Sequence, residues 1–424
     1  MFTTLKNAWS IPELRKKLLF TLLILMLYRV GNVIPVPYID VDTLAAYFES
    51  TLSTTILGLY DAMSGSAFSQ ATVFALGIQP YINASIIIQL LTIAIPALER
   101  MAKEEGEEGK KKIGRITCYT TVGLGLLLGW AYYMMLNNYA SAGLSIITKE
   151  GIMPALVIIL AFAAGSAVVM WLGEQITEYG IGNGISMILF ANIISASPHG
   201  ISSLVSLGWW QAILVLVAIV ALVVFIVFIN DAERRIPIQY AKRVVGRKIY
   251  GGQSTNLPIK VSMSGVMPVI FASSICSIPA TICTLGGWTN TTIYKVLFSN
   301  TSWVYVIMYG LMIFFFSWFY STIQYDPVEI ANNLKKNGGF IPGFRPGKPT
   351  ADFIKRVINK IVIFGAVYLA IVALLPIVAG NLVSDLQNLA IGGTSVIIVV
   401  GVALETVKAL EAQMLMRHYK GFLD

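Results

Sequence analysis

Apolar stretches of about 20 residues recur along the whole chain, separated by shorter polar segments. A helix needs about 20 apolar residues to cross the roughly 30 Å hydrocarbon core of a bilayer. The pattern therefore predicts ten membrane-spanning helices. Their expected ranges are 18–37, 72–95, 115–136, 152–172, 181–196, 209–229, 262–284, 302–323, 357–379 and 390–410.

Basic residues fall almost entirely on one side of these stretches. Of the 30 Lys and Arg residues, 27 lie in the two terminal segments or in the connections after the second, sixth and eighth stretches. Only Lys149 and Lys295 lie on the other side, and Arg29 lies inside the first stretch. Because cytoplasmic loops carry the excess of Lys and Arg, both termini are expected in the cytoplasm.

The composition excludes most classes of soluble protein. The chain is 56% apolar and only 12% charged, whereas a soluble domain carries about 25% charged residues. The net charge of +8 follows from the basic cytoplasmic loops and does not by itself indicate nucleic-acid binding.

Ten helices divide at 197–208 into five and five, so the two halves have opposite orientations. An odd number of helices in each half is typical of an inverted repeat, in which the functional path lies between the halves. We therefore predict an all-α integral membrane protein with an N-terminal half, 1–200, and a C-terminal half, 201–424. A secondary transporter with five-plus-five repeats is the alternative, although such proteins place ionisable groups near the midplane, where only Arg29 is a candidate.

One outer segment, 38–71, is acidic and contains no basic residue. Its later part, 56–69, is moderately apolar and rich in small residues but too short to cross a membrane. Irregular backbone at membrane depth is tolerated against protein or a water-filled cavity. A short re-entrant element and a helix on the outer surface fit this pattern about equally.

Two cytoplasmic loops, 230–261 and 324–356, are longer than a helical hairpin needs. In the first, 235–240 alternates and 244–250 is β-prone, which predicts a twisted hairpin. In the second, 338–349 is rich in Gly and Pro and predicts rigid turns. Loops of this length usually bind a partner, and their basic residues suit an acidic protein surface or RNA phosphates.

No arrangement of residues indicates catalysis, so we predict no catalytic residue, no metal and no cofactor. The two histidines, His199 and His418, are isolated, and the three cysteines lack metal-ligand spacing. Segment 343–350 resembles a phosphate-binding loop only superficially, because Pro349 stands where the loop needs a hydroxyl. For Arg29, pairing with a helix-end carbonyl or a neighbouring segment is favoured over a functional charge.

Several longer motifs resemble the SecY family of protein-translocating channels. They occupy 34–37, 74–91, 171–186, 240–243, 253–255, 257–260, 333–347 and 392–395. The resemblance covers essentially the whole chain. It implies two five-helix halves around an hourglass pore, with a short plug half-helix at about 58–69.

The resemblance also implies four sets of site residues. The pore ring falls on Ile78, Ile82, Ile185, Leu189, Ile270 and Ile398, with Leu189 in place of the commoner isoleucine. The plug includes Gly58, Leu59, Tyr60, Met63, Ser64, Gly65 and Phe68. The lateral gate, between the second and seventh helices, includes Asn83, Ser85, Ser273 and Ser277. The residues implied to meet a motor or ribosome are Arg243, Arg247, Lys248 and Arg345.

By this resemblance, the chain passes unfolded secretory polypeptides across a bacterial plasma membrane and releases transmembrane segments sideways into lipid. The implied partners are the small subunits SecE and SecG, the SecA motor ATPase, the ribosome, signal sequences and membrane lipids. The physics agrees, because a narrow apolar ring seals by dewetting yet offers no specific hydrogen bond to a passing chain. Without a nucleotide site, the energy for transport must come from a partner.

Overall fold

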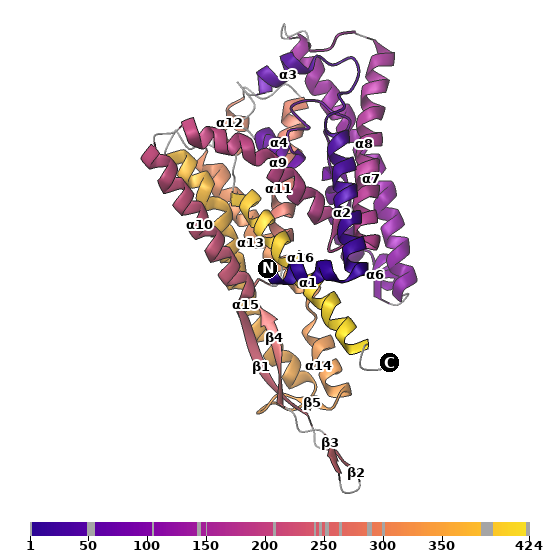
Figure 1. Cartoon of the computed structure of the whole chain (residues 1–424), viewed down its shortest axis with the longest axis vertical. Coiled ribbons are helices and arrows are strands. Elements are labelled where there is room, and N and C mark those ends of the chain that lie inside the picture. The colour runs from indigo at the N-terminus through magenta and orange to yellow at the C-terminus, as the bar shows by residue number, and fades with distance from the viewer. Residues whose placement is uncertain are drawn as a thin grey trace.

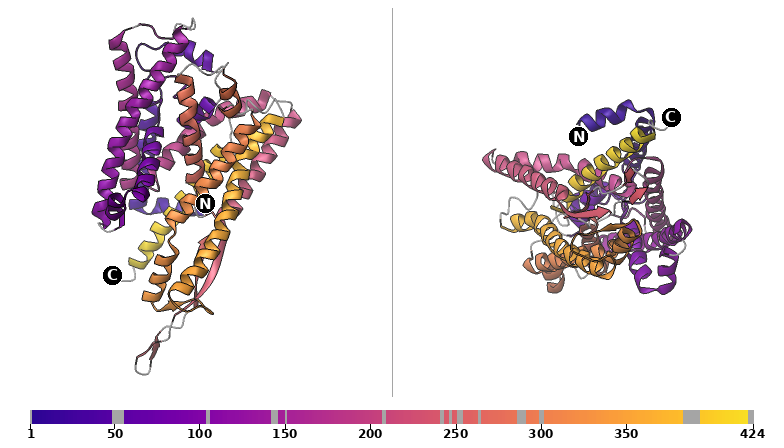
Figure 2. Two further views of the ribbon diagram at one scale, coloured as in Figure 1. Left: turned by 180° about the vertical axis from the view of Figure 1, so that it is seen from behind. Right: turned by 90° about the horizontal axis from the view of Figure 1, so that it is seen from below.

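The computed structural model describes residues 2–48, 56–103, 106–141, 146–149, 151–206, 209–240, 243–245, 248–250, 254–262, 265–285, 291–298, 302–382 and 393–420. Long helices form two neighbouring groups, and strands project from one end of the molecule (Figures 1 and 2). One group contains α7 and α8, and the other contains α10, α13, α15 and α16.

Each predicted span coincides with a long helix. These helices are α2 (Pro12–Gly31), α5 (Gln79–Ala94), α7 (Gly106–Ser141), α8 (Ile152–Tyr179), α9 (Gly184–Ser206), α10 (Trp209–Asp231), α11 (Met267–Leu285), α13 (Trp303–Gln324), α15 (Lys348–Leu382) and α16 (Gly393–Lys420). The shorter helices are α1 (Phe2–Ser10), α3 (Val41–Tyr47), α4 (Ile56–Ser64), α6 (Pro96–Lys103), α12 (Thr292–Phe298) and α14 (Pro327–Lys336).

The apolar helices make the chain a multi-pass membrane protein. Within the described ranges, α8, α10, the run from α13 into α14, and α15 are each long and apolar enough to cross a bilayer. Helices α5 and α6 form a further candidate, bent by 105° at the break between them. Ten crossings stay a prediction, as does the division into halves, which falls near the end of α9.

Two predicted boundaries were wrong. Thr72 forms a β-bridge with Pro35, residues 73–78 form turns, and α5 begins only at Gln79. Gly77 has a φ of +52°, which a helix does not accept, and Pro80 suits a first helical turn because it lacks the N–H that would stay unpaired there. The first helix ends at Gly31 rather than at 37, because the chain turns before two prolines.

Helix α4 packs inside the bundle, beside α9 and α11 (Figure 1). It is followed by a turn in which Gly65 and Ser66 both have positive φ. Met63 is only 4% exposed and belongs to the main apolar core. This segment therefore lies within the helical bundle and not on its outer surface.

Helices α8 and α9 approach closely where α9 begins. A Cβ atom at Gly184 would lie 1.9 Å from the carbonyl oxygen of Gly173. Only a residue without a side chain permits this backbone contact. The contact places Ile185, the next residue of α9, against the neighbouring helix.

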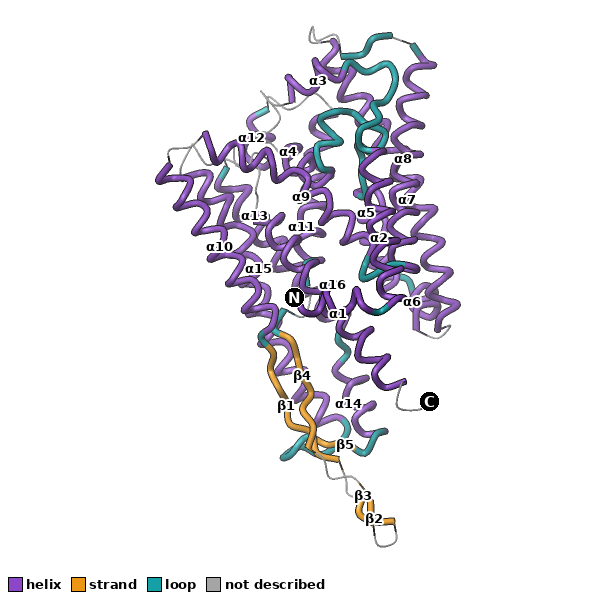
Figure 3. The backbone as a smooth tube through the Cα atoms, in the orientation of Figure 1, coloured by secondary structure: helices purple, strands orange, loops and turns teal. Residues whose placement is uncertain are grey.

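The strands lie at the end of the molecule that carries the basic loops (Figure 3). A three-stranded antiparallel sheet has the order β4-β1-β5, with β1 (Glu233–Tyr240), β4 (Ser254–Lys260) and β5 (Gly339–Phe340). Strands β2 (Arg243–Val245) and β3 (Lys248–Tyr250) form a separate hairpin, as predicted. Alternate residues of β1, Ile236 and Ile238, are buried against the extended end of α15.

Candidate functional site

Six branched side chains from four helices meet in the main apolar core. Five are buried members of that core, and Ile185 is partly buried against it. Ile78 and Ile82 come from the start of α5, Ile185 and Leu189 from α9, Ile270 from α11 and Ile398 from α16. The Cδ1 methyl of Ile78 and the Cγ1 methylene of Ile185 both lie within 4 Å of the point where a Cβ of Gly173 would stand. The structure thus gathers all six residues assigned to the pore ring.

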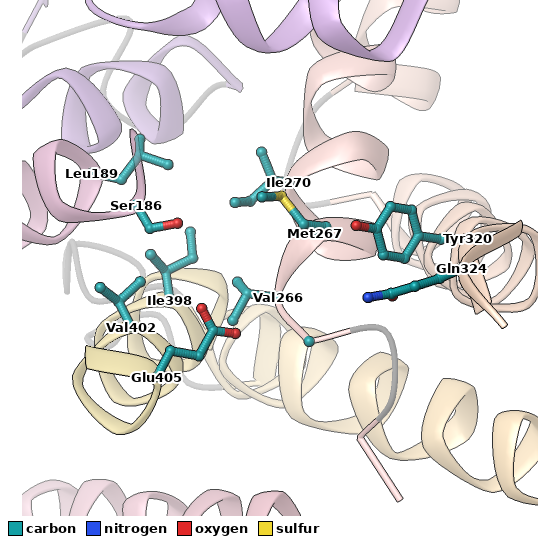
Figure 4. A pocket seen from close by; sticks show the side chains of 11 residues that line it. Ser186, Leu189, Val266, Met267, Ile270, Tyr320, Gln324, Ile398, Val402 and Glu405 are labelled. Carbon is teal, nitrogen blue, oxygen red and sulfur yellow. The ribbon is translucent and has the colours of Figure 1, made fainter. Parts of the chain in front are cut away.

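A cavity of about 210 Å³ opens on the side of the cluster that faces the strands. Leu189, Ile270 and Ile398 form part of its wall (Figure 4). The remaining lining comes from the same helices and from α13: Ser186, Gly265, Val266, Met267, Tyr320, Gln324, Val402 and Glu405. Its wall contains one carboxylate, that of Glu405, so the cavity is largely uncharged.

Helix α4 packs beside α9 and α11, two of the helices that supply the cluster. Met63 packs in the same core as the six branched residues. The ring of Phe68 lies 5.0 Å from that of Tyr60 and 4.6 Å from that of Tyr132, and the Tyr132 hydroxyl donates to the Phe68 carbonyl oxygen at 2.6 Å. Met63 of the assigned plug thus lies in the main core, whereas Phe68 and Tyr60 pack with Tyr132 in a second apolar cluster. The side chain of Leu59 lies outside the described residues.

Further polar contacts fix the turn after α4. The amide of Asn192 donates to the Met63 carbonyl at 2.9 Å, and that of Asn32 donates to the Ser64 carbonyl at 3.4 Å. Within the segment, the Ser64 hydroxyl accepts from the Phe68 N–H at 3.1 Å. The segment 58–69 is therefore held by groups from both its own chain section and α2 and α9.

The residues assigned to the gate lie on α5 and α11, which pack together. Ser273 and Ser277 donate to carbonyls of their own helix. Asn83 is buried, and its Oδ1 has no hydrogen-bond partner among the residues described. Ser85 on the same helix is partly buried.

Sequence reasoning missed the polar contact that does cross this interface. The hydroxyl of Ser274 donates to Oε1 of Gln79 at 3.2 Å, and Nε2 of Gln79 lies 3.7 Å from the sulfur of Met63. Gln79 thus touches both α11 and α4. The available signal was a lone glutamine in an apolar motif, immediately before Pro80.

The basic loops present exposed cations beyond the helices. Arg345 is exposed, and its carbonyl accepts from the Thr350 hydroxyl at 2.8 Å, which fixes the backbone of its turn. Arg243 begins β2 and Lys248 begins β3, whereas Arg247 lies outside the described residues. Other exposed basic residues on this end are Arg234, Arg235, Lys260, Lys335, Lys336, Lys348, Lys355 and Arg356.

The outer segment keeps its negative charge. Asp40 precedes α3, and the Thr43 hydroxyl donates to its carboxylate at 2.6 Å. That hydrogen bond lowers the pKa of Asp40 below its ordinary value, because it stabilises the charged form. Asp40 is therefore negatively charged at neutral pH.

The sequence profile of the SecY family matches residues 72–407. A protein translocase subunit SecY of Streptomyces scabiei is 43% identical, over 100% of each chain. One similar solved structure concerns a SecY protein whose plug domain stabilises the closed state of the translocation channel and maintains a membrane seal; its TM-score is 0.68 at 18% identity, over 96% of each chain. Another is Sec61 in a canine ribosome–channel complex from the endoplasmic reticulum, with a TM-score of 0.62 at 16% identity, over 96% of each chain.

Proposed function

The chain belongs to the SecY family and is a channel subunit of a protein translocase, and from that premise we propose that unfolded polypeptides cross through its ring of six branched residues. The observation that supports this most is the cluster itself. The six apolar side chains lie in or against one core, which also contains Met63 of α4, and three of the six line a cavity. No charged group is contributed by the six.

A transported polypeptide presents every kind of side chain, so its path cannot depend on specific hydrogen bonds. Branched apolar side chains form a constriction that water leaves spontaneously. They also deform around a passing chain, because apolar contact is non-directional. Such a ring passes unrelated sequences and closes again behind them.

Around this ring we assign the remaining parts of the channel. We assign segment 58–69 as the plug, because Met63 packs in the same core as the ring residues and α4 contacts α9 and α11. The interface of α5 and α11 is the lateral gate, through which an apolar segment reaches lipid. Ten crossings, with both termini in the cytoplasm of a bacterium, are consistent with the distribution of Lys and Arg.

The basic end of the molecule is proposed as the docking surface for the partner that supplies energy or substrate. Its exposed cations suit the phosphates of ribosomal RNA or an acidic surface of the SecA motor, with an affinity that falls as salt rises. The canine relative was solved with a ribosome, which supports the first of these. SecE and SecG are proposed to cover exposed apolar helix surfaces, of which α10 is the most extensive.

A crosslinking experiment tests the proposed path. A photoreactive amino acid replaces Ile82 or Ile270 in the channel, and a secretory chain is stalled during transport. We expect adducts from both positions. The matched control is Leu216 on α10, which is exposed on the outside of the bundle and should give none. Adducts from Leu216 alone would refute the central path and favour a small-molecule transporter.

A further inference from the structure

Two asparagines from other elements donate to the C-terminal end of α4, and a third polar side chain, that of Arg29, lies beside it. We propose that Asn32, Asn192 and Arg29 cap this helix end and thereby retain the plug in its resting position. The inference rests on the proposed role of 58–69 as the plug. It assigns the retention to side chains of α2, the residue after it, and α9.

The two asparagines meet an elementary need of a helix end. The last four carbonyls of an α-helix have no partner within the helix. In α4, the carbonyls of Met63 and Ser64 are of this kind, and they accept from Asn192 and Asn32. Both asparagines are buried, at 0% and 6% exposed, so water does not compete easily for these bonds.

Arg29 adds charge at the same place. Its Nη1 lies 3.0 Å from the point where a Cβ of Gly65 would stand, directly after the last residue of α4. A helix end with free carbonyls is partly negative and favours a cation. Nη1 is buried and has no hydrogen-bond partner within the described part of the chain. Its charge is therefore available to the helix end.

The contacts that retain the plug can also be released. Oδ1 of Asn32 and Oδ1 of Asn192 are also buried without a partner among the described residues. A buried acceptor without a partner is costly, and departure of the plug would admit water to both atoms. The resting contacts therefore stabilise the plug without making its release prohibitive.

These contacts predict an unusual division of roles. The plug contributes only main-chain carbonyls to Asn32 and Asn192, so its own side chains are not needed for this hold. The three capping side chains, in contrast, cannot be replaced by apolar groups of equal size. A substitution in α2 or α9 should thus loosen the plug without altering the plug sequence.

The experiment measures resting ion conductance of the full-length channel in planar bilayers. Asn192→Leu keeps the side-chain volume and removes the amide donor, and Arg29→Gln removes the charge. Each should raise the open fraction roughly two- to tenfold, as expected for the loss of one hydrogen bond or helix-end charge. Arg29→Lys should restore low conductance. The control Ile194→Leu changes a lipid-exposed residue two positions along α9 and should behave as the parent.

A channel lacking 58–69 separates the possible outcomes. If the deletion raises conductance but Asn192→Leu and Arg29→Gln match the parent, the capping inference is wrong and the plug assignment survives. If the deletion itself changes nothing, the plug assignment fails. Asn192→Leu should add no conductance in the deleted channel, and extra leakage there would mean general damage and overturn the inference.

Discussion

Replacing Gly184 by alanine tests the packing that positions the pore ring. The added Cβ would lie 1.9 Å from the carbonyl oxygen of Gly173 and 2.8 Å from the Cβ of Ile176. The first contact is with backbone, which no side-chain rotation relieves. To reach an ordinary contact of 3.4 Å or more, α8 and α9 must separate by about 1.5 Å, in an interior packed as densely as a crystal.

The expected change in the free energy of unfolding follows from two opposing effects. Overpacking of this kind costs typically about 1–3 kcal/mol, and the better helix propensity of alanine returns at most about 1 kcal/mol. We therefore expect Gly184→Ala to lower the free energy of unfolding by about 1–2 kcal/mol. Because Ile185 follows directly, the same shift should loosen the ring and raise resting conductance.

Gly173→Ala in the facing helix is the matched control. Its Cβ would meet only methyl and methylene groups, at 3.5–3.7 Å, which is ordinary van der Waals contact. It should be neutral or stabilising by up to about 1 kcal/mol. The assay is thermal unfolding of the purified channel by tryptophan fluorescence, followed by conductance in bilayers. Equal transition temperatures for Gly184→Ala and the parent would refute the reasoning.

Three further predictions address the ring, the gate and the docking surface. Ile270→Ser should make the resting channel conduct ions. The control Val169→Ser, in the same core but away from the cavity, should only lower thermal stability. Equal conductance of the two variants would contradict the proposed seal. Gln79→Leu and Ser274→Ala should each favour opening of the proposed gate, measured by crosslinking across α5 and α11. In a double-mutant cycle the two changes should show a coupling of about 0.5–1.5 kcal/mol. Additive effects would show that the bond between Gln79 and Ser274 does not contribute to gate closure. Arg345→Glu should abolish motor-driven secretion in vesicles while the channel still inserts into membranes, and normal secretion would exclude Arg345 from docking.

The sequence located the long helices well, because a run of about 20 apolar residues has few alternatives to a buried helix. It also located the hairpin of β2 and β3. It placed the start of α5 too early, since hydropathy continues through 72–78 while the backbone turns at Gly77. Local composition does not report the sign of φ at a single residue.

Contacts between distant segments were beyond the sequence. The bond between Gln79 and Ser274 joins residues 195 positions apart, and β5 pairs with β1 although it contains only two residues. The sequence favoured a pairing of Arg29 with a helix-end carbonyl or a neighbouring segment. In the structure, Nη1 of Arg29 lies beside the end of α4. The guanidinium Nη1 nevertheless makes no hydrogen bond within the described residues.

The proposed ring and the proposed plug depend on different kinds of interaction, and each kind suits the task of its part. The ring is apolar, so its closure needs no particular geometry and survives the passage of any side chain. The proposed plug receives directional bonds from Asn32 and Asn192 at two of its carbonyls, and such bonds are lost within a small displacement. Gln79 links that retention to α11. A transported chain that separates α5 from α11 would therefore weaken the contacts of the proposed plug before the chain reaches the plug. The ring would continue to exclude water during this step.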